Sequence, residues 1–442
     1  MKATIMPRFL YNSFMATMVA VAAILVFAAD THLAAQEAKQ ADAGFEIPAT
    51  DAGLPGAGPL RRYDWFRDLW KTKRSGWAQR VKQDQGEVVF LGDSITQGWG
   101  DDFGKSFDDL KVANRGISGD TTRGMLIRLE QDVLSLKPRA VVLLMGTNDL
   151  EEKAEPETIA ANFKLIVAAL KKHNAKMPII LCKVFPSSET KSRPAEKIKQ
   201  INDLFAAAVK GDSQIVVMET WLLFADQEGR AKEKEFPDLL HPNEAGYKKW
   251  AAALRPVFAT YGFLETEPDQ FKNEPGFVSL FNGKDLSGWG FQATPDKQAV
   301  SFDGKSASDD GRFVAINGRL VVTTPPEGRR VQQLWTTREF PKDFILKLEF
   351  RATPFADSGV FIRAPQLQCR DYSLAGPFTE LQKYAPQEWN ELVVTVKGKV
   401  AHCTCNGEVL AEALEVPAAG GIGLEGDRGQ MEYRRIRIKE LP

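Results

Sequence analysis

Histidine and cysteine are scarce in this chain, with only four of each among 442 residues. The cysteines are Cys182, Cys369, Cys403 and Cys405, and only the last two lie close together. A structural zinc site needs a second closely spaced pair of ligands, so this class of site is excluded. The shortage of histidine also leaves few candidates for a general base.

Excess charge of one sign is absent too. Lys and Arg total 57, Asp and Glu total 58, and the net charge is -1. Without excess positive charge the chain has no strong electrostatic attraction for polyanions, so we expect no nucleic-acid partner. Beyond the first thirty residues no apolar run is long enough to span a bilayer, so no stable membrane insertion is expected after signal cleavage.

The N-terminus has the pattern of a secretory signal. Lys2 and Arg8 precede an uncharged stretch over residues 9–29, and Leu33-Ala34-Ala35 offers small residues for cleavage. We therefore predict a signal peptide over residues 1–35 and a secreted or periplasmic protein, with an uncleaved anchor as the rival interpretation. Export would permit a disulfide between Cys369 and either Cys403 or Cys405.

Two domains are expected from the length and the pattern. An Ala-, Gly- and Pro-rich linker over residues 36–60 leads into residues 61–263, where short apolar runs alternate with helical stretches. That alternation predicts a parallel sheet with helices on both faces. A polar linker over 264–275 then leads into residues 276–442, where alternating apolar and polar residues between Gly and Asn turns predict an antiparallel β-sandwich.

Chemistry-bearing residues follow the apolar runs of the first domain. Ser94, Gly116 and Asn148 each come just after such a run, and Asp238 and His241 precede the last helical stretch. Open α/β sheets build their sites at the carboxyl ends of the strands. We therefore expect these residues to converge on one edge of the sheet.

His241 is the only general-base candidate for this domain. His32 belongs to the signal region, His173 ends a helical stretch beside two lysines, and His402 lies in the second domain. His241 precedes Pro242 and has the alternative of merely starting a helix. Asp238 makes this alternative less attractive, because a carboxylate there can fix the imidazole tautomer.

Each motif is ambiguous by itself. Gly92-Asp93-Ser94 is also a common helix cap, and Gly116 and Asn148 are also common turn residues. Thr96 stands where the nucleophile elbow of an ordinary α/β-hydrolase has its second glycine, so that fold is not indicated.

Taken together, GDSITQGWG, NRGISGD, GTND and the Asp238–His241 pair resemble the SGNH or GDSL-type hydrolases, in the platelet-activating-factor acetylhydrolase-like branch. The resemblance covers residues 88–258 and implies a three-layer α/β/α fold. It implies Ser94, Asp238 and His241 as catalytic triad, an oxyanion hole of Ser94, Gly116 and Asn148, and no metal or other cofactor.

The second domain resembles the 3-keto-disaccharide hydrolase family over residues 276–441, through FNGKDLSGW, DSGVFIR and GIGL. This implies a concanavalin- or laminin-G-like jelly roll that contacts sugars. Relatives tend to carry glutamate where this chain has Gln366, which cannot act as an acid or base. Carbohydrate binding is therefore expected rather than glycoside cleavage, with Trp289 and Arg363 as candidates; a passive sandwich is the alternative.

The sequence thus predicts a secreted esterase that removes acyl groups, in particular acetyl groups, from carbohydrates. A lipid- or thioester-directed hydrolase with the same triad is one alternative. A carbohydrate-binding protein with a non-catalytic SGNH domain is another.

Overall fold

A computed structural model describes residues 44–108, 110–323 and 332–442 of the chain. The predicted signal peptide and the first part of the predicted linker lie outside the described residues. The chain divides into two compact units. One combines the residues up to Gly53 with Arg62–Val81, and the other combines Leu54–Arg61 with Lys82–Pro442.

The first unit is built around helix α2 (Asp64–Asp84), whose last residues belong to the second unit. Phe66 and Trp70 lie one turn apart on this helix, are fully buried, and have ring centroids 5.7 Å apart. The Arg62 side chain donates to the backbone oxygen of Pro48 at 2.9 Å and pairs with Asp51. The two rings form a small core in this unit, and the Arg62 contacts hold the preceding segment near the start of α2.

The second unit begins with a five-stranded parallel sheet in the order β2-β1-β3-β4-β5. The strands are almost entirely apolar and buried, as expected for a parallel sheet covered on both faces. Their bounds are β1 (Val88–Gly92), β2 (Val112–Gly116), β3 (Ala140–Leu143), β4 (Ile179–Cys182) and β5 (Ile215–Met218).

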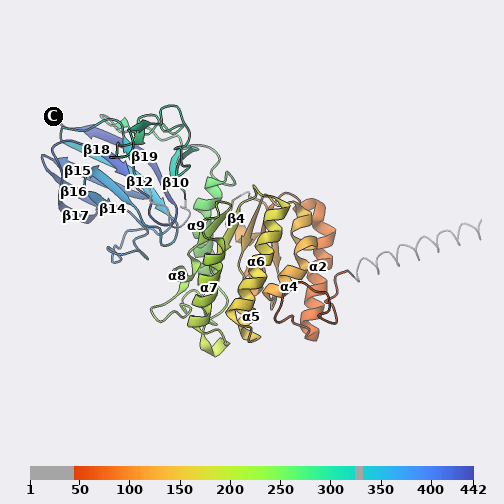
Figure 1. The fold of residues 1–442 in the computed structure, drawn as a ribbon. Helices are drawn as coiled ribbons and strands as arrows, with labels where there is room; N and C mark the ends of the chain where they lie inside the picture. The colour runs from red at the N-terminus through yellow and green to blue at the C-terminus, as the bar shows by residue number, and fades with distance from the viewer. Residues whose placement is uncertain (1–43, 109, 324–331) are drawn as a thin grey trace, which may run out of the picture. The chain divides into compact units, whose positions relative to one another are not determined.

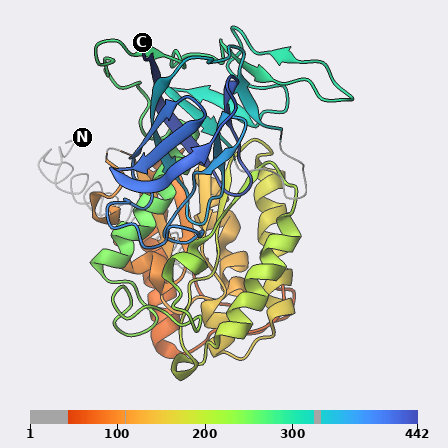
Figure 2. The same ribbon diagram turned by 90° about the vertical axis from the view of Figure 1, so that its left-hand side faces the viewer.

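Helices cover both faces of this sheet, as Figures 1 and 2 show. Phe90, Val142 and Ile180 point to one face, where they share a core with Trp250 and Leu254 of α9. On the other side, α6 and α7 pack together through Phe163 and Phe205. The helices are α3 (Ser94–Gly98), α4 (Thr122–Asp132), α5 (Thr147–Glu151), α6 (Pro156–His173), α7 (Ala195–Val209), α8 (Thr220–Phe224) and α9 (Glu244–Thr260), with single 3₁₀ turns at Phe103–Lys105, Leu134–Leu136 and Glu189–Lys191. The predicted α/β/α layering is confirmed.

The remainder of the chain forms two antiparallel sheets, which confirms the predicted all-β domain. One sheet has the order β17-β16-β15-β12-β19-β10-β9, with β6 paired to β19, and the other has the order β14-β13-β18-β11-β7-β8. A single apolar core includes residues of both sheets. The strands are β6 (Val278–Ser279), β7 (Trp289–Phe291), β8 (Val300–Ser301), β9 (Phe313–Ile316), β10 (Arg319–Val322), β11 (Leu334–Thr336), β12 (Phe344–Ala352), β13 (Gly359–Arg363), β14 (Gln366–Gln368), β15 (Asn390–Lys397), β16 (Val400–Cys405), β17 (Glu408–Glu415), β18 (Gly421–Leu424) and β19 (Met431–Glu440).

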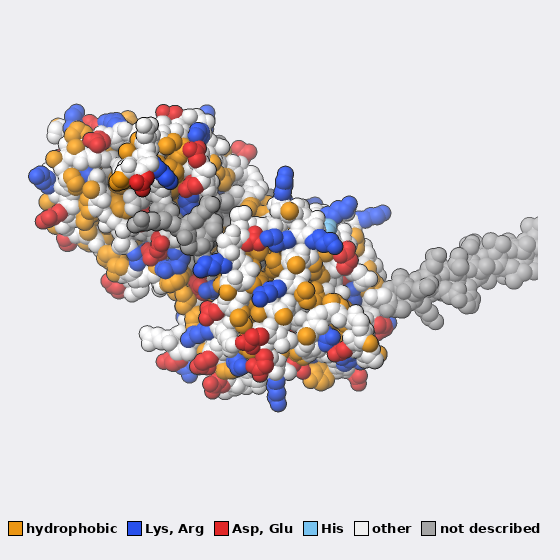
Figure 3. Space-filling view, in the orientation of Figure 1, with side chains coloured by type: hydrophobic (Ala, Val, Ile, Leu, Met, Phe, Trp, Pro, Cys, Tyr) orange, Lys and Arg blue, Asp and Glu red, His pale blue; other side chains and the backbone are white. Residues whose placement is uncertain are grey.

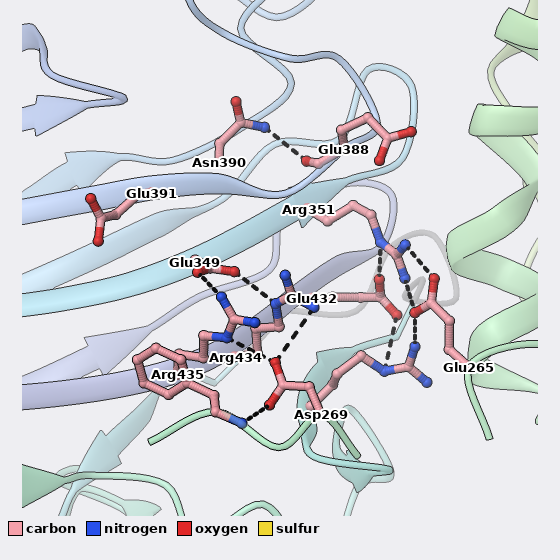
Figure 4. Close-up of polar contacts among 12 residues, drawn as sticks. Glu265, Asp269, Glu349, Arg351, Glu388, Asn390, Glu391, Glu432, Arg434 and Arg435 are labelled. Atoms are coloured by element: carbon pink, nitrogen blue, oxygen red, sulfur yellow. Dashed lines mark hydrogen bonds and ion pairs between the residues drawn. The ribbon is translucent and has the colours of Figure 1, made fainter. Parts of the chain in front are cut away.

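The predicted linker over 264–275 is attached to this sandwich. Its acidic residues Glu265, Asp269 and Glu274 each pair with arginines of the eight-stranded sheet. Figure 4 shows Glu265 against Arg351, and Asp269 against the arginines of β19. The ion pairs hold this segment on the sheet, so it differs from a free linker.

The predicted disulfide is absent from the described residues. Cys182, Cys369, Cys403 and Cys405 are all buried free thiols. Burial raises the pKa of Cys403 to about 12, and that of Cys405 likewise, so neither is an activated thiolate. Their contribution is apolar packing between the sheets.

Charged side chains of both signs are mixed over the face shown in Figure 3, in keeping with the near-zero net charge. Among the described residues, no helix combines the length and the apolar character needed to cross a membrane.

Candidate active site

Ser94 occupies the sharp turn between β1 and α3. Gly92 ends the strand, and Ser94 is the first residue of the helix. Asp93 caps that helix, because its Oδ1 accepts the Ile95 N–H at 2.9 Å. A side chain at Gly92 would place its Cβ 2.1 Å from Thr96 Oγ1, so only glycine fits there. The strand order changes direction at β1 and β3, which is where open α/β sheets place their sites.

His241 and Asp238 reach Ser94 from the segment before α9. His241 Nε2 lies 2.9 Å from Ser94 Oγ, and His241 Nδ1 lies 2.7 Å from Asp238 Oδ2. The other Asp238 oxygen accepts the N–H groups of Leu240 and His241 at 3.0 and 2.7 Å. Residues 147 positions apart in the chain are thus joined in one hydrogen-bonded series.

Asp238 is held in its charged form. Partial burial opposes the charge, but hydrogen bonds from the His241 backbone, the His241 ring and the Leu240 backbone outweigh it and lower the pKa of Asp238 to about 2. A carboxylate that is ionised at any moderate pH keeps a proton on Nδ1 of the imidazole. It therefore leaves Nε2 as the acceptor that faces Ser94.

Asn148 lies on the short helix α5, which follows β3, and is 2% exposed. Its Nδ2 donates one hydrogen to the backbone oxygen of Asp120 at 3.0 Å, and its Oδ1 accepts from Arg193 Nη2 at 3.0 Å. These two contacts determine which end of the amide is the nitrogen and which is the oxygen. The second Nδ2 hydrogen is left for another acceptor.

The assignment of Gly116 as an oxyanion donor needs correction. Gly116 ends β2 in register with Gly92, and its N–H already donates to Asn114 Oδ1 at 2.9 Å in a buried position. Gly119, three residues on, has φ +85°, and its N–H has no acceptor among the described residues. The motif contains both glycines, but only the strand register shows which one is free of the sheet.

Three further carboxylates are buried near this edge of the sheet. Burial raises the pKa of Asp93 to about 6, that of Asp120 to about 7 and that of Asp149 to about 6. Asp120 pairs with Arg128 at 2.7 Å, and Asp149 accepts both the N–H and the hydroxyl of Thr122. Their contacts are within loops and caps. Among the described residues, no cluster of three His, Cys, Asp or Glu side chains is arranged to hold a metal ion.

Trp289 and Arg363, the sugar-contact candidates of the second domain, are structural. Trp289 is fully buried in the sandwich core, and its Nε1 donates to the backbone oxygen of Leu280. Arg363 is 4% exposed and donates to four backbone oxygens, those of Phe340, Lys342, Gly398 and Pro417. Neither can reach a ligand, so both predictions are wrong.

A different set of side chains shares the non-core face of the six-stranded sheet. Trp335 and Phe361 lie side by side with ring centroids 5.3 Å apart. Gln366 pairs with Phe361 across β13 and β14, and Glu425 directly follows β18. The Glu425 carboxylate accepts Nε2 of Gln366 at 2.7 Å and Nε2 of Gln333 at 3.1 Å. This polar row combines two amides and one carboxylate beside an aromatic pair.

Two family models match the chain. Residues 90–249 match the GDSL-like lipase/acylhydrolase family, and residues 276–439 match the 3-keto-alpha-glucoside-1,2-lyase-like domain.

Among curated relatives, platelet-activating factor acetylhydrolase IB subunit alpha2 of Homo sapiens is 27% identical over 206 residues, covering 46% of this chain and 88% of that protein. Subunit alpha1 of Rattus norvegicus is 29% identical over 188 residues, covering 42% and 80%. A solved GDSL-like lipase of Bacteroides thetaiotaomicron is 26% identical with a TM-score of 0.38, covering 44% of this chain and 97% of that one.

Proposed function

Because residues 90–249 form a GDSL-like acylhydrolase domain, we propose that the chain is an exported serine esterase with Ser94 as its nucleophile. The observation that carries the proposal is the series Ser94 Oγ–His241 Nε2 and His241 Nδ1–Asp238. Nucleophile, base and orienting carboxylate in hydrogen-bond contact are the requirement for acyl transfer through a covalent intermediate. Export rests on the N-terminal sequence alone.

The reaction has two steps. In the first, Ser94 Oγ bonds to the ester carbonyl carbon while its proton passes to His241 Nε2, and the alcohol then leaves with that proton. In the second, His241 takes a proton from water, whose oxygen attacks the acyl carbon; the bond to Ser94 Oγ then breaks, His241 returns the proton to Oγ, and the acid is released. Asp238 stays ionised and stabilises the imidazolium formed in each step.

The oxyanion faces three donors in this proposal. They are the N–H groups of Ser94 and Gly119 and the second Nδ2 hydrogen of Asn148. Ser94 is the first residue of its helix, where backbone N–H groups have no intrahelical partner. Gly119 takes the place that the sequence assigned to Gly116.

Acetyl esters of carbohydrates are the proposed substrates. The acetyl preference is supported by relatives that are named acetylhydrolases, and the carbohydrate by the adjoining 3-keto-alpha-glucoside-1,2-lyase-like domain. Lipid or thioester hydrolysis with the same triad is the second candidate, favoured by the lipase relationship of the family. The contacts of Ser94 and His241 argue against a non-catalytic domain.

For the second domain we propose carbohydrate binding at the polar row of Gln333, Gln366 and Glu425. Amide and carboxylate groups supply the donors and acceptors that sugar hydroxyls need. The neighbouring rings of Trp335 and Phe361 are each 8% exposed, so they support this row from below and the polar groups carry the proposal. In the full chain, Glu425→Ala should weaken glycan binding while hydrolysis of a small ester is unchanged. Unchanged glycan binding would remove this assignment.

The central experiment compares purified full-length protein with its Ser94→Ala variant. Both are incubated with acetylated polysaccharides and with p-nitrophenyl esters of increasing chain length. Acetate release from the polysaccharides and from the acetyl ester, abolished in Ser94→Ala, is the expected result. A preference for long acyl chains would favour the lipid-directed alternative, and full activity of Ser94→Ala would refute the assignment.

A further inference from the structure

Residues 54–60 lie in the region predicted to be a linker and Arg61 directly follows it, yet the segment Leu54–Arg61 is bound to the parallel-sheet domain at several points. The N–H of Ala57 donates to Asn162 Oδ1 at 3.0 Å, and Asn162 Nδ2 returns a bond to the oxygen of Ala57 at 2.8 Å. Thr121 Oγ1 donates to the oxygen of Pro59, and Arg123 Nη1 to that of Gly58. We call residues 54–61 the strap.

One chain of contacts runs from the strap to the amide oxygen of Asn148. Arg61 pairs with Glu151, whose Oε2 also accepts Arg193 Nη2 at 2.8 Å. The same Arg193 nitrogen donates to Asn148 Oδ1 at 3.0 Å. Arg61 and Arg193 are 7% and 2% exposed, whereas the Glu151 side chain between them is 45% exposed, so water screens these pairs only in part.

A second chain runs from the strap to the residue next to Asn148. Asn162, held by Ala57, donates Nδ2 to Thr122 Oγ1 at 3.0 Å. Thr122 in turn donates its hydroxyl to Asp149 at 2.6 Å. Asn162, Thr122 and Asp149 are each fully buried. Both chains therefore end on the same short helix, α5, at neighbouring positions.

Helix α5 has only five residues, so its own hydrogen bonds hold it weakly. The direction of the Asn148 amide depends on what surrounds it. An oxyanion donor works only when it is held in place before the reaction, and a displacement of about 1 Å can cost a large part of its effect.

We propose that the strap is a positioning element of the esterase site, which sets the Asn148 amide through Arg61–Glu151–Arg193 and through Asn162–Thr122–Asp149. The inference rests on the proposed function, since it assumes that Asn148 faces an oxyanion. Arg61, Glu151, Arg193 and Asn162 are positioning residues, and among the described contacts none of them forms a hydrogen bond with Ser94 or His241.

The test uses the full chain with Arg61→Ala, Glu151→Ala and Asn162→Ala, assayed on p-nitrophenyl acetate. We expect kcat to fall about ten-fold in each with little change in KM, because substrate binding does not depend on the oxyanion donor. Glu155→Ala is the matched control, since Glu155 forms an exposed ion pair with Lys197 and belongs to neither series of contacts. Thermal melts confirm that each variant is folded at the assay temperature.

A double-mutant cycle separates positioning from general support of the fold. The same substitutions in an Asn148→Ala background should lower kcat no further, because the group that they position is gone. Arg61→Lys keeps one charge but cannot meet Glu151 and Glu152 together as Arg61 does, and should restore kcat in part. Unchanged kcat in folded single variants, or equal losses with and without Asn148, would overturn the proposal.

Failure of the proposed esterase function would give a different set of results. If the wild-type chain hydrolyses no ester and Ser94 is not labelled by a fluorophosphonate, then the esterase assignment falls and the strap proposal falls with it. If the wild-type chain is active and labelled while the strap variants match it, only the strap proposal is overturned.

Discussion

Replacing Asn148 tests the oxyanion hole at its most clearly defined side chain. In Asn148→Ala the amide disappears, and with it one donor to the oxyanion. Loss of one such donor typically lowers kcat about 100- to 1,000-fold, or about 2.7–4 kcal/mol of transition-state stabilisation. KM should change little, because the donor acts on charge that develops only in the transition state.

The same substitution has a separate cost in stability. The buried Asp120 oxygen loses a donor, and Arg193 loses an acceptor. Leaving such buried groups unpaired destabilises by about 1–3 kcal/mol. The protein should therefore remain folded but melt at a lower temperature, and kcat has to be measured well below that melting point.

Asn148→Asp is the informative companion. It keeps an oxygen toward Arg193 but has no N–H to offer, and its charge would oppose an oxyanion. Above neutral pH, kcat of Asn148→Asp should fall at least as far as that of Asn148→Ala. The assay is initial-rate hydrolysis of p-nitrophenyl acetate with Ser94→Ala as the blank. If Asn148→Asp retains wild-type kcat, Asn148 serves only to hold Arg193 and the oxyanion assignment is wrong.

Three further predictions concern stability and thiols. Burial raises the pKa of Asp93 to about 6, above its ordinary value, so the folded state holds this proton more tightly than the unfolded state. The contribution of Asp93 to the free energy of unfolding therefore falls as pH rises from about 4 through 6. Asp93→Asn can still cap α3 and should reduce this pH dependence, measured by urea unfolding at pH 5 and 7.5. A steeper dependence in the variant would contradict this. Arg363→Ala should destabilise by about 1–3 kcal/mol, since it removes the donor to four backbone oxygens through one buried and three part-buried hydrogen bonds. Calorimetry of the full chain should show a lower transition, and an unchanged melting temperature would refute this structural role of Arg363. Iodoacetamide in denaturant without reductant should add four groups by mass, one per cysteine, and a count of two would instead support the expected disulfide.

The fold could be predicted where burial dictates composition. Runs such as Val88–Leu91 are apolar throughout because both faces of the parallel sheet are covered, and Phe344–Phe350 alternates because one face of β12 meets the sandwich core. The triad could be predicted because so few histidines were available, because Ser94 followed an apolar run, and because Asp238 lay three residues before His241.

Other features depend on tertiary contacts that leave little trace in local sequence. Gly116 and Gly119 look equivalent in NRGISGD, and only the pairing of Gly116 with Gly92 separates them. Arg193 lies 45 residues from Asn148 in a loop that no motif marks. Trp289 and Arg363 look like ligand groups by residue type, but burial of the ring and four backbone acceptors decide otherwise.

The anchored segment between the two domains matters for how the chain can be divided experimentally. A fragment starting at residue 276, where the family match begins, would omit Glu265, Asp269 and Glu274. Arg351 and Arg437, which are 1% and 3% exposed, would then each lose a carboxylate partner. Removing the partner of a buried arginine is destabilising, although Glu265 and Glu274 are themselves 29% and 39% exposed. A self-sufficient sandwich fragment should therefore begin before Glu265, and one trimmed to the family boundary should express poorly or aggregate.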